Sequence, residues 1–319
     1  MSEGRPLESA AGEVAARVAA VVVNYNTAEL LVDCVASLRA EGIKEIVVVD
    51  NASVDDSRGR LAAADPAATF IPAGANRGYG AGANIGLRAT DSELVLVGNA
   101  DLVFEAGAIA ALVAALDADP RRGLVGPRVL NRDGSVYPSV RTFPAIGDAL
   151  GHAFLGLVAP SNRWSARYKM LDWDHSRAAE ADWISGSCFL ARREALDALG
   201  GFDEAYFMYS EDVDLCWRAW KRGWRVAYEP AAAVTHVQGA STDLRPYRMI
   251  AHHHLSLLRF AYRSTEGWRR ALLPAVAAGL FLRTVLSAAQ RAGEGARQRV
   301  PWLAGPGPGE RAPARSRVG

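Results

Sequence analysis

The feature of this chain that most constrains its fold is a series of short apolar runs in the N-terminal third, separated by helical patterns. The runs cover residues 17–23, 46–49, 69–72 and 94–97. After the first run, apolar residues recur at the three-four spacing of a helix, namely Leu30, Leu31, Cys34, Val35 and Leu38. A second helix is expected around residues 81–89. Strands rich in β-branched residues that alternate with helices are typical of a mostly parallel sheet with helices on both faces, so we expect an α/β fold.

Polar residues follow these runs where each strand is expected to end. They are Asn24, Tyr25 and Asn26 after the first run, Asp50 and Asn51 after the second, and Asn99 and Asp101 after the fourth. In a parallel sheet such residues converge on a ligand crevice. A carboxylate at position 50 can accept the imide N–H of uracil or thymine, although Asp-Asn-x-Ser is also a good turn sequence. Asp101, a diphosphate and waters would make an octahedral Mg²⁺ or Mn²⁺ site.

A second cluster of acidic residues follows an aromatic run. Glu211, Asp212 and Asp214 lie at the start of an amphipathic helix, directly after residues 206–210. Acidic residues in a first helical turn complement the helix dipole, and Ser210 could be an N-cap. The same carboxylates beside aromatic surface suit acid/base chemistry in a partly buried pocket. The cluster alone leaves both interpretations open.

Residues 78–83, Gly-Tyr-Gly-Ala-Gly-Ala, match the dinucleotide fingerprint, with Asp101 about twenty positions further on. That fingerprint belongs in the first strand-to-helix turn, and here that turn is residues 24–27, which contain no glycine. We therefore expect these glycines to let the backbone approach a ligand closely at a helix N-terminus.

Three features of the second half are ambiguous on their own. His236 follows a strand-like segment and could be a structural histidine or a ligand. Trp183 and Gly186 lie in a strand-like stretch, residues 183–190. They could pack in the strand or form a wall on which a sugar stacks. Residues 252–254 are three consecutive histidines, which point to different faces of a helix and so cannot share one metal. We expect them at the surface or near a membrane.

Composition excludes several classes of protein. The chain has 319 residues and a formal net charge of +1, so no basic excess indicates nucleic acid. Its three cysteines form no CxxC pair, which predicts reduced thiols rather than disulfides or structural zinc. The N-terminus lacks an apolar core of the signal-peptide type, so a cytoplasmic location is expected.

The C-terminal part is predicted to be helical and basic. Residues 271–289 are apolar but contain Pro274, Gly279 and Arg283, and arginines flank them on both sides. An interfacial helix on an anionic membrane fits this pattern better than a membrane span. Packing on the domain or on a partner subunit is equally open. The expected organisation is a disordered tail at 1–16, a catalytic domain at 17–245, a basic helical appendage at 246–290 and a disordered tail at 291–319.

Taken together, these motifs resemble the family 2 glycosyltransferases, which are inverting enzymes with the Rossmann-like GT-A fold. The matching pieces lie in the same order between residues 17 and 245: Asn24-Tyr-Asn, Asp50-Asn-Ala-Ser, Asn76-Arg-Gly-Tyr-Gly, Asn99-Ala-Asp, Trp183-Ile-Ser-Gly-Ser, Gly201-Phe-Asp-Glu, Ser210-Glu-Asp-Val-Asp and His236. The family usually has Asn-Pro-Asp or Asp-x-Asp at its metal motif. Here Ala100 is the middle residue, and the carboxylate is kept. Residues 133–139, 183–188, 207–214 and 251–253 are similar to bacterial rhamnosyltransferases that act on GlcNAc-diphospho-polyprenol in cell-wall linker assembly.

The resemblance implies a role for each matching residue. Asp50 would read the base, with Asn24, Tyr25 and Asn26 nearby, and Asn76, Arg77 and Gly78 would approach the phosphates. Asp101 and His236 would hold Mg²⁺ or Mn²⁺. Asp212 would be the general base with Glu211 supporting it, and Trp183, Gly186 and Asp214 would contact the sugar or the acceptor.

The resemblance also implies partners. The donor would be a nucleotide sugar, dTDP- or UDP-linked, and the acceptor a lipid-linked sugar at the inner face of the membrane. The sequence leaves the oligomeric state open, with a homodimer as one option. Two alternatives are a UDP-galactofuranose or other UDP-sugar transferase of the same fold, and a non-catalytic protein that binds sugar nucleotides.

Overall fold

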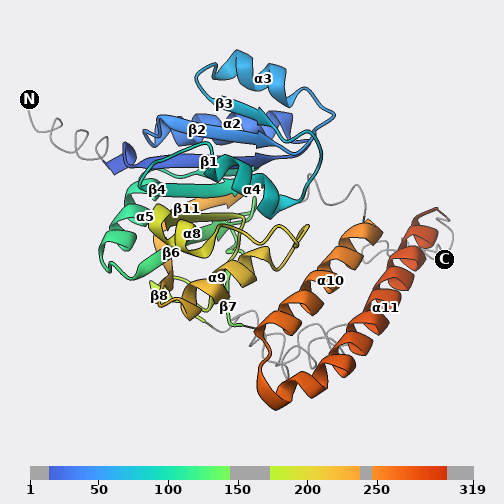
Figure 1. The fold of residues 1–319 in the computed structure, drawn as a ribbon. Coiled ribbons are helices and arrows are strands. Elements are labelled where there is room, and N and C mark those ends of the chain that lie inside the picture. The colour runs from blue at the N-terminus through green and yellow to red at the C-terminus, as the bar shows by residue number, and fades with distance from the viewer. Residues whose placement is uncertain (1–13, 144–172, 238–245, 300–319) are drawn as a thin grey trace, which may run out of the picture.

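The computed structural model describes residues 14–143, 173–237 and 246–299 (Figure 1). Residues 144–172 and most of both expected terminal tails lie outside these ranges. Within them, one sheet of nine strands has the order β3-β2-β1-β4-β10-β6-β11-β5, and β8 pairs with β11. A separate pair consists of β7 and β9.

The first four strands form the expected parallel half of the sheet. They are β1 (Val18–Asn24), β2 (Glu45–Asp50), β3 (Thr69–Pro72) and β4 (Leu94–Asn99), and their pairings are all parallel. The chain places helices α2 (Ala28–Ala40), α3 (Ser57–Ala64) and α4 (Tyr79–Leu87) between them. The alternation of strands and helices expected from the sequence is therefore confirmed.

The rest of the sheet is mixed. Its strands are β5 (Leu102–Phe104), β6 (Arg122–Leu130), β8 (Ala179–Glu180), β10 (Cys188–Arg192) and β11 (Arg225–His236). Strand β10 runs antiparallel to both β4 and β6, whereas β6 and β11 are parallel. Helices α5 (Ala108–Asp117), α8 (Arg193–Leu199) and α9 (Glu211–Lys221) complete the domain.

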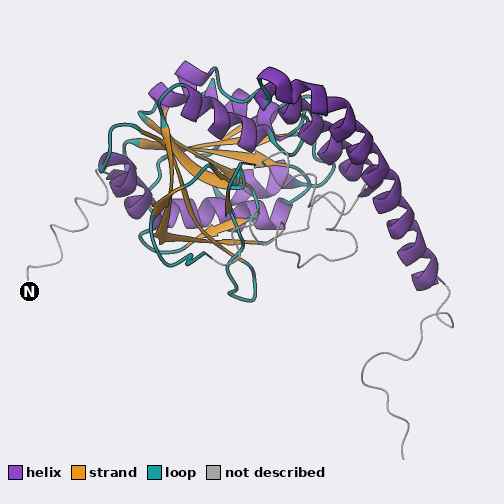
Figure 2. Ribbon diagram, turned by 90° about the horizontal axis from the view of Figure 1, so that it is seen from below, coloured by secondary structure: helices purple, strands orange, loops and turns teal. Residues whose placement is uncertain are grey.

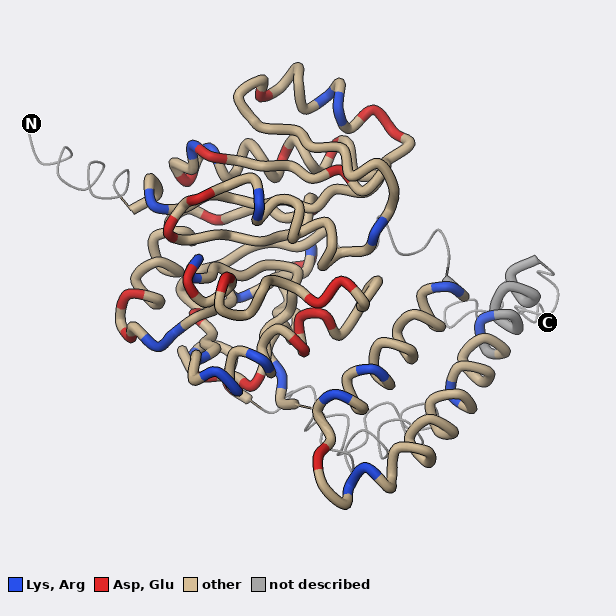
Figure 3. Tube along the Cα trace, in the orientation of Figure 1, with Lys and Arg blue, Asp and Glu red and all other residues tan. Residues whose placement is uncertain are grey.

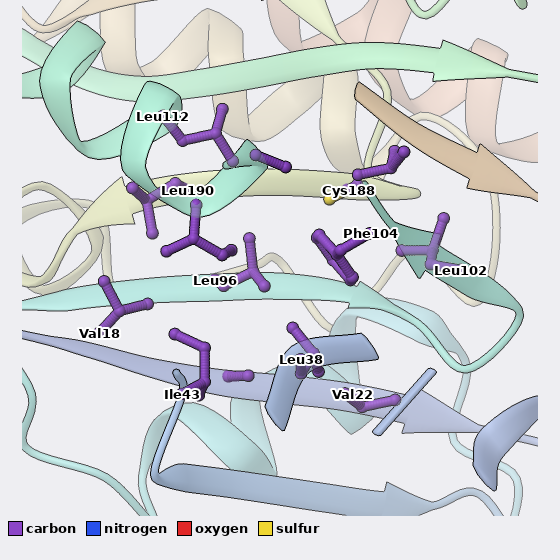
Figure 4. Close-up of a cluster of buried hydrophobic side chains, with 14 of the residues drawn as sticks. Val18, Val22, Leu38, Ile43, Leu96, Leu102, Phe104, Leu112, Cys188 and Leu190 are labelled. Carbon is purple, nitrogen blue, oxygen red and sulfur yellow. The ribbon is translucent and has the colours of Figure 1, made fainter. Parts of the chain in front are cut away.

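Both faces of the sheet are covered because successive strand residues point to opposite sides. In β1, Val18 and Val22 belong to one buried cluster, which includes apolar residues of α2 and α5 (Figure 4). Val21 and Val23 belong to another, which includes residues of α4, α8 and α9. This sandwich leaves only the ends of the strands open, and the polar residues lie there.

The strand-like stretch 183–190 is not one strand. Trp183–Ile184 forms β9 and pairs with Val140–Arg141 of β7 outside the main sheet, while β10 begins at Cys188. The segment between them bends away because Ser185 N–H bonds the Ser139 carbonyl, whereas the Ser187 carbonyl accepts from Asn99 N–H. This break brings Gly186 to the end of the sheet.

Two C-terminal helices form a hairpin, α10 (Pro246–Ser264) and α11 (Leu273–Arg299), joined by a 3₁₀ turn (Gly267–Leu272) (Figures 1 and 2). Phe260 of α10 is 2% exposed and belongs to the domain core. Helix α11 projects away from the sheet, as Figure 2 shows. It continues to Arg299, past the boundary expected at residue 290, because Ala, Arg, Gln and Glu favour helix. At the other end Ala15 is already buried, so ordered chain begins before residue 17.

The hairpin carries exposed apolar surface. Within residues 267–289, an 18-residue window has a mean hydropathy of 1.7, and only 22% of that window is buried; by length and composition the helix could cross a membrane. Trp268 and Phe281 are 77% and 72% exposed. Lys and Arg residues recur along both helices (Figure 3).

Candidate active site

A cavity of about 730 Å³ opens where β1, β2 and β4 end. Asn24 lies beside Asp50 in the parallel register, and Val23 lies beside Asn99, so the three strand ends meet as expected. Many of the residues expected at the site line this cavity, namely Tyr25, Asn26, Asn76, Asp101, Trp183, Gly186, Glu211, Asp212 and His236. Others lie behind its wall or away from it: Asn24, Asp50, Arg77, Gly78 and Asp214.

Asp50 is held at the end of β2 by a network of hydrogen bonds. Its Oδ1 accepts from Asn24 Nδ2 at 2.8 Å and from Ser53 Oγ at 2.5 Å, and its Oδ2 accepts from Ser53 N–H at 3.0 Å. Asn24 is fully buried, and its own Oδ1 accepts from Thr27 Oγ1 at 2.7 Å. The expected contact of Asn24 with a nucleotide is therefore wrong for this geometry, since Asn24 is buried, its Nδ2 bonds Asp50 and its Oδ1 bonds Thr27.

The turn after β1 is fixed in a similar way. Asn26 has φ +54°, its N–H bonds Ser53 Oγ at 2.9 Å, and its Oδ1 accepts from Val54 N–H at 2.7 Å. These contacts join the loops that follow β1 and β2. Tyr25 is thereby held at the wall of the cavity.

The glycine-rich loop before α4 contacts protein rather than open space. Gly78 has φ +92°, and a Cβ placed on it would lie 2.0 Å from the Phe207 carbonyl oxygen. The neighbouring Tyr79 N–H donates to that same oxygen at 3.0 Å, and Asn51 Nδ2 donates to the Gly78 carbonyl at 2.9 Å. The close backbone approach expected here therefore exists, but it joins two protein loops.

Two polar residues precede that glycine. Asn76 lines the cavity, and its Oδ1 accepts from Gly78 N–H at 3.1 Å. Arg77 is exposed outside the cavity, with its Nε donating to the Ala73 carbonyl at 3.3 Å. Arg77 would have to reorient to meet a phosphate.

Asp101 and His236 meet at the wall of the cavity. Their Oδ1 and Nε2 atoms are 3.0 Å apart, and Asn99 Nδ2 lies 3.2 Å from the same nitrogen. Within the described residues, no group of three or more His, Cys, Asp or Glu side chains could hold a metal. One carboxylate and one imidazole nevertheless fit a divalent cation whose remaining positions are filled by water and a substrate diphosphate, because Mg²⁺-type ions commonly use few protein ligands.

Glu211 and Asp212 begin α9 and face the cavity. Asp212 Oδ2 accepts from Gly186 N–H at 2.9 Å, and its Oδ1 accepts from Val213 N–H at 2.8 Å. Burial raises the pKa of Asp212, while these two N–H groups and the charge of Arg141 oppose the rise. Burial and the neighbouring Asp212 raise the pKa of Glu211 to about 8. We infer that the proton resides on Glu211 near neutral pH and that Asp212 is the ionised carboxylate.

Two residues before α9 adopt a conformation that is rare without glycine. Tyr209 and Ser210 have φ +68° and +63°. Such strain persists only when surrounding structure holds it in place, and it is common at active sites. Ser210 makes no side-chain cap bond to α9, so the expected N-cap role of its hydroxyl is wrong.

Trp183 and Arg141 form another part of the cavity wall. Trp183 is 5% exposed and its Nε1 donates to the Thr142 carbonyl at 2.9 Å. The Arg141 guanidinium lies over its ring, 5.2 Å from the centroid, and both residues line the cavity. Arg141 could not be predicted from the sequence pattern, because β7 has only two residues.

The position of Asp214 differs from the prediction that it contacts the sugar or the acceptor. Asp214 is fully buried and does not line the cavity; its Oδ2 accepts from Arg218 Nε at 2.6 Å, and Arg263 Nε lies 3.2 Å from its Oδ1. Residues two positions apart on a helix point about 200° apart, so Asp214 must face away when Asp212 faces the cavity. Asp214 therefore joins α9 to α10 instead of contacting a sugar.

Helix α10 also completes the cavity, which the sequence did not predict. Arg248, Met249, His253 and Leu257 line it, with His253 packed edge-on against Tyr209 at 5.1 Å. Two further contacts hold the loop before α9: His252 stacks on Phe207, and Ser256 Oγ donates to the Met208 carbonyl at 2.9 Å.

The three consecutive histidines were expected at the surface or near a membrane, and the structure corrects this for His254, which is buried within the protein. His254 is 6% exposed, between α10 and α11, with its Nδ1 2.8 Å from Thr284 Oγ1. Burial lowers its pKa to about 4. The three side chains point to three different neighbours, as consecutive helical residues must.

Known proteins share this sequence pattern. The model of Glycosyl transferase family 2 matches residues 19–200, and that of Glycosyl transferase family group 2 matches residues 161–287. An N-acetylglucosaminyl-diphospho-decaprenol L-rhamnosyltransferase of Mycobacterium tuberculosis is 39% identical over 248 residues, which cover 74% of this chain and 80% of that protein. A low-salt glycan biosynthesis hexosyltransferase of Haloferax volcanii is 29% identical over 62% of this chain and 60% of that protein.

The fold has solved counterparts. A mannosyltransferase from Pyrobaculum calidifontis, in complex with GDP-Man and Mn²⁺, superposes with a TM-score of 0.54 at 19% identity, covering 90% of this chain and 83% of that one. At this level of identity the likeness supports the fold alone. The family match over residues 19–200 shows that the chain belongs to glycosyl transferase family 2.

Proposed function

We propose that this protein transfers L-rhamnose from dTDP-L-rhamnose to a GlcNAc carried on a polyprenyl diphosphate, with inversion at the anomeric carbon. The single observation that carries the chemistry is that Asp101 and Asp212 line one cavity, with Asp50 fixed at the end of β2 behind its wall. The choice of sugar and acceptor is supported by the likeness to the mycobacterial rhamnosyltransferase.

The nucleotide would bind over the ends of β1 and β2. In this proposal the fixed carboxylate of Asp50 accepts the imide N–H of the base, while Tyr25 and Asn26 border the nucleoside. Asn76 and Arg77 would meet the phosphates from the loop before α4. Uracil and thymine share the imide N–H, so these residues are equally suited to a UDP-sugar.

Asp101 and His236 would hold a divalent cation. The chemistry that such an ion supplies when bound is neutralisation of the charge on the departing nucleoside diphosphate. The proximity of the two side chains, 3.0 Å between Oδ1 and Nε2, supports this role.

Asp212 is the proposed general base. It would take the proton of an acceptor hydroxyl as that oxygen attacks the anomeric carbon; the bond from carbon to the diphosphate oxygen breaks, and its electron pair leaves with the diphosphate. Attack from the face opposite the leaving group inverts the configuration. One displacement needs one base and no enzyme nucleophile. Trp183 and Gly186 border the same space and would contact the sugar or the acceptor.

A lipid-linked acceptor gives the hairpin of α10 and α11 a role. We infer that it holds the protein on the inner face of the cytoplasmic membrane, with its exposed apolar residues in the interface and its arginines near anionic headgroups. Arg248 and Met249 of α10 form part of the cavity wall, so the cavity borders the hairpin, which suits a diphosphate attached to a lipid. Co-flotation with anionic vesicles, lost when Trp268 and Phe281 are both changed to Ser, tests this part.

The donor is tested by measuring nucleotide release from dTDP-rhamnose and from UDP-sugars in the presence of acceptor and Mg²⁺ or Mn²⁺. Release only from UDP-sugars would refute the rhamnose assignment and favour a UDP-galactofuranose or other UDP-sugar transferase. Asp212→Asn is expected to lower turnover by at least ~10² while nucleotide binding is retained. Unchanged turnover would remove Asp212 as the base, and absence of turnover from every donor would favour a non-catalytic sugar-nucleotide-binding protein.

A further inference from the structure

A chain of hydrogen bonds joins the loop before α4 to the carboxylate of Asp212. The Tyr79 hydroxyl donates to the Gly186 carbonyl oxygen. The N–H of the same residue, Gly186, donates to Asp212 Oδ2 at 2.9 Å. Both backbone polar groups of residue 186 are therefore hydrogen-bonded, the carbonyl to Tyr79 and the N–H to the proposed base, Asp212.

The absence of a side chain at residue 186 makes this contact possible. A Cβ there would lie 3.1 Å from Asp212 Cβ and 3.5 Å from Tyr79 Cε1. Residue 186 also lies in the break between β9 and β10, where no sheet pairing fixes its backbone. Its orientation depends on the groups that bond it.

Tyr79 is itself well fixed. Its N–H bonds the Phe207 carbonyl at 3.0 Å, and its ring packs edge-on against Phe202 with the centroids 6.0 Å apart. Burial raises the pKa of Tyr79 well above its usual range, so the hydroxyl stays protonated and can donate. The backbone contact does not depend on the hydroxyl, and therefore Tyr79→Phe should leave the two loops joined.

We propose that Tyr79 is a positioning residue for the general base Asp212, acting through the backbone of Gly186. Without the Tyr79 hydroxyl, the carbonyl of residue 186 is no longer held in place. The N–H of residue 186 then points less well at Asp212. Asp212 loses a donor that favours its ionised form and fixes the direction of its second oxygen. This inference rests on the proposed role of Asp212.

Other charged and titratable groups also act on Asp212. They are Glu211 and Cys216 on α9, Arg141 on β7 and Tyr79 on α4. Arg248 and His253 of α10 line the same cavity. None of these groups is altered by Tyr79→Phe except the hydroxyl itself. A change in the titration of Asp212 in this variant therefore reports the bond through residue 186.

The test compares Tyr79→Phe with the unaltered protein by two measurements. In steady-state kinetics, kcat is expected to fall about tenfold, the acid limb of its pH profile to move up by about one pH unit, and the KM for the donor to stay unchanged; a hydrogen bond to a charged group has an effect of this order. In carbon-13 NMR, the titration of the Asp212 carboxyl carbon, assigned with Asp212→Asn, should move in the same direction.

Tyr228→Phe is the matched control. The Tyr228 hydroxyl donates to the His175 carbonyl at 2.9 Å, and its ring is buried in the core away from the cavity. Tyr228→Phe therefore removes the same kind of hydrogen bond, and it should lower stability without moving the pH profile of kcat. Equal effects of the two variants on kcat and on the pH profile would overturn the proposal, and so would a fall in kcat for Tyr79→Phe without a shift in the titration of Asp212.

Gly186→Ala provides a second route if Tyr79→Phe does not fold. The added Cβ would lie 3.1 Å from Asp212 Cβ, so the two residues must move apart by a few tenths of an ångström while the Tyr79 hydroxyl is retained. An upward shift in the same direction is expected, and an unchanged titration would refute the proposal. The NMR titration needs no substrate. If the unaltered protein turns over no donor, the proposed function fails, and the positioning of Asp212 by Tyr79 is still decided.

Discussion

Replacing Gly78 by Ala tests whether the contact between the loops before α4 and α9 shapes the active site. Gly78 has φ +92° and ψ 171°, a region that residues other than glycine rarely adopt. The added Cβ would lie 2.0 Å from the Phe207 carbonyl oxygen and 2.7 Å from its carbon, while real Cβ contacts essentially never fall below 3.0 Å. The two loops must therefore separate by about 1 Å.

The magnitude follows from these distances. Backbone strain at residue 78 costs about 1–3 kcal/mol. Loss of the hydrogen bond from Tyr79 N–H to the Phe207 carbonyl, now 3.0 Å, costs about 1 kcal/mol more. We expect the free energy of unfolding to fall by about 2–4 kcal/mol. Asp212 lies five residues after Phe207, and a misplacement of about 1 Å can reduce the rate by about 10².

Urea denaturation and steady-state kinetics measure the two effects, with Gly74→Ala as the control. Gly74 also has a positive φ, +76°, but a Cβ there would meet nothing within 4 Å. The control should lose about 1–2 kcal/mol of stability, as a left-handed residue does, and keep its kcat. Equal losses of kcat at the two positions would refute the argument that the contact with Phe207, rather than backbone strain, lowers kcat in Gly78→Ala.

Three further changes have expected outcomes. Glu211→Gln should flatten the dependence of stability on pH. In the folded protein the pKa of Glu211 is about 8, above its ordinary value of 4.5, so the native state keeps a proton that the unfolded state loses. The unaltered protein should therefore lose stability as the pH rises from about 4.5 to about 8. Melting temperatures across that range measure this, and parallel curves for the two proteins would contradict it. Asp214→Asn should lower the free energy of unfolding by roughly 3–5 kcal/mol, because Arg218, whose side chain is 8% exposed, would keep its charge without a carboxylate partner. As the control, Lys221→Ala breaks the exposed ion pair of Lys221 with Glu266 and should lower it by less than ~1 kcal/mol in the same denaturation assay. Asp101→Ala should abolish the thermal stabilisation that Mn²⁺ with nucleoside diphosphate gives the unaltered protein, and persistence of that stabilisation would exclude Asp101 as a ligand.

Most of the parallel half of the fold could be predicted because its signal is local. The runs that became β1, β2 and β4 are apolar throughout, since both faces of these strands are buried. The second half gave weaker signals. Strand β9 has two residues and leaves the main sheet, and β11 contains irregularities of register after Arg225 and Glu229. Short and irregular strands have no periodicity to detect.

The cavity was predictable to the extent that it lies at strand ends. Asp101 and His236, far apart in the sequence, meet because β5, which begins directly after Asp101, pairs antiparallel with β11 and places Leu102 opposite His236. Arg141 and His253 lay outside the predicted site because they come from a two-residue strand and from a helix that was expected to be an appendage. Only packing places them at the cavity.

The sequence by itself determined the alternation of strands and helices, the polar residues at strand ends and the family to which they correspond, because each depends on residues close together in the chain. The tertiary structure alone decided which of the acids on α9 faces the cavity. Asp212 points toward Gly186, and Asp214 points toward Arg218 and Arg263. That division depends on how α9 is rotated against the sheet and against α10. Rotation is set by core contacts such as Phe260, which lies 48 residues beyond Asp212 in the chain.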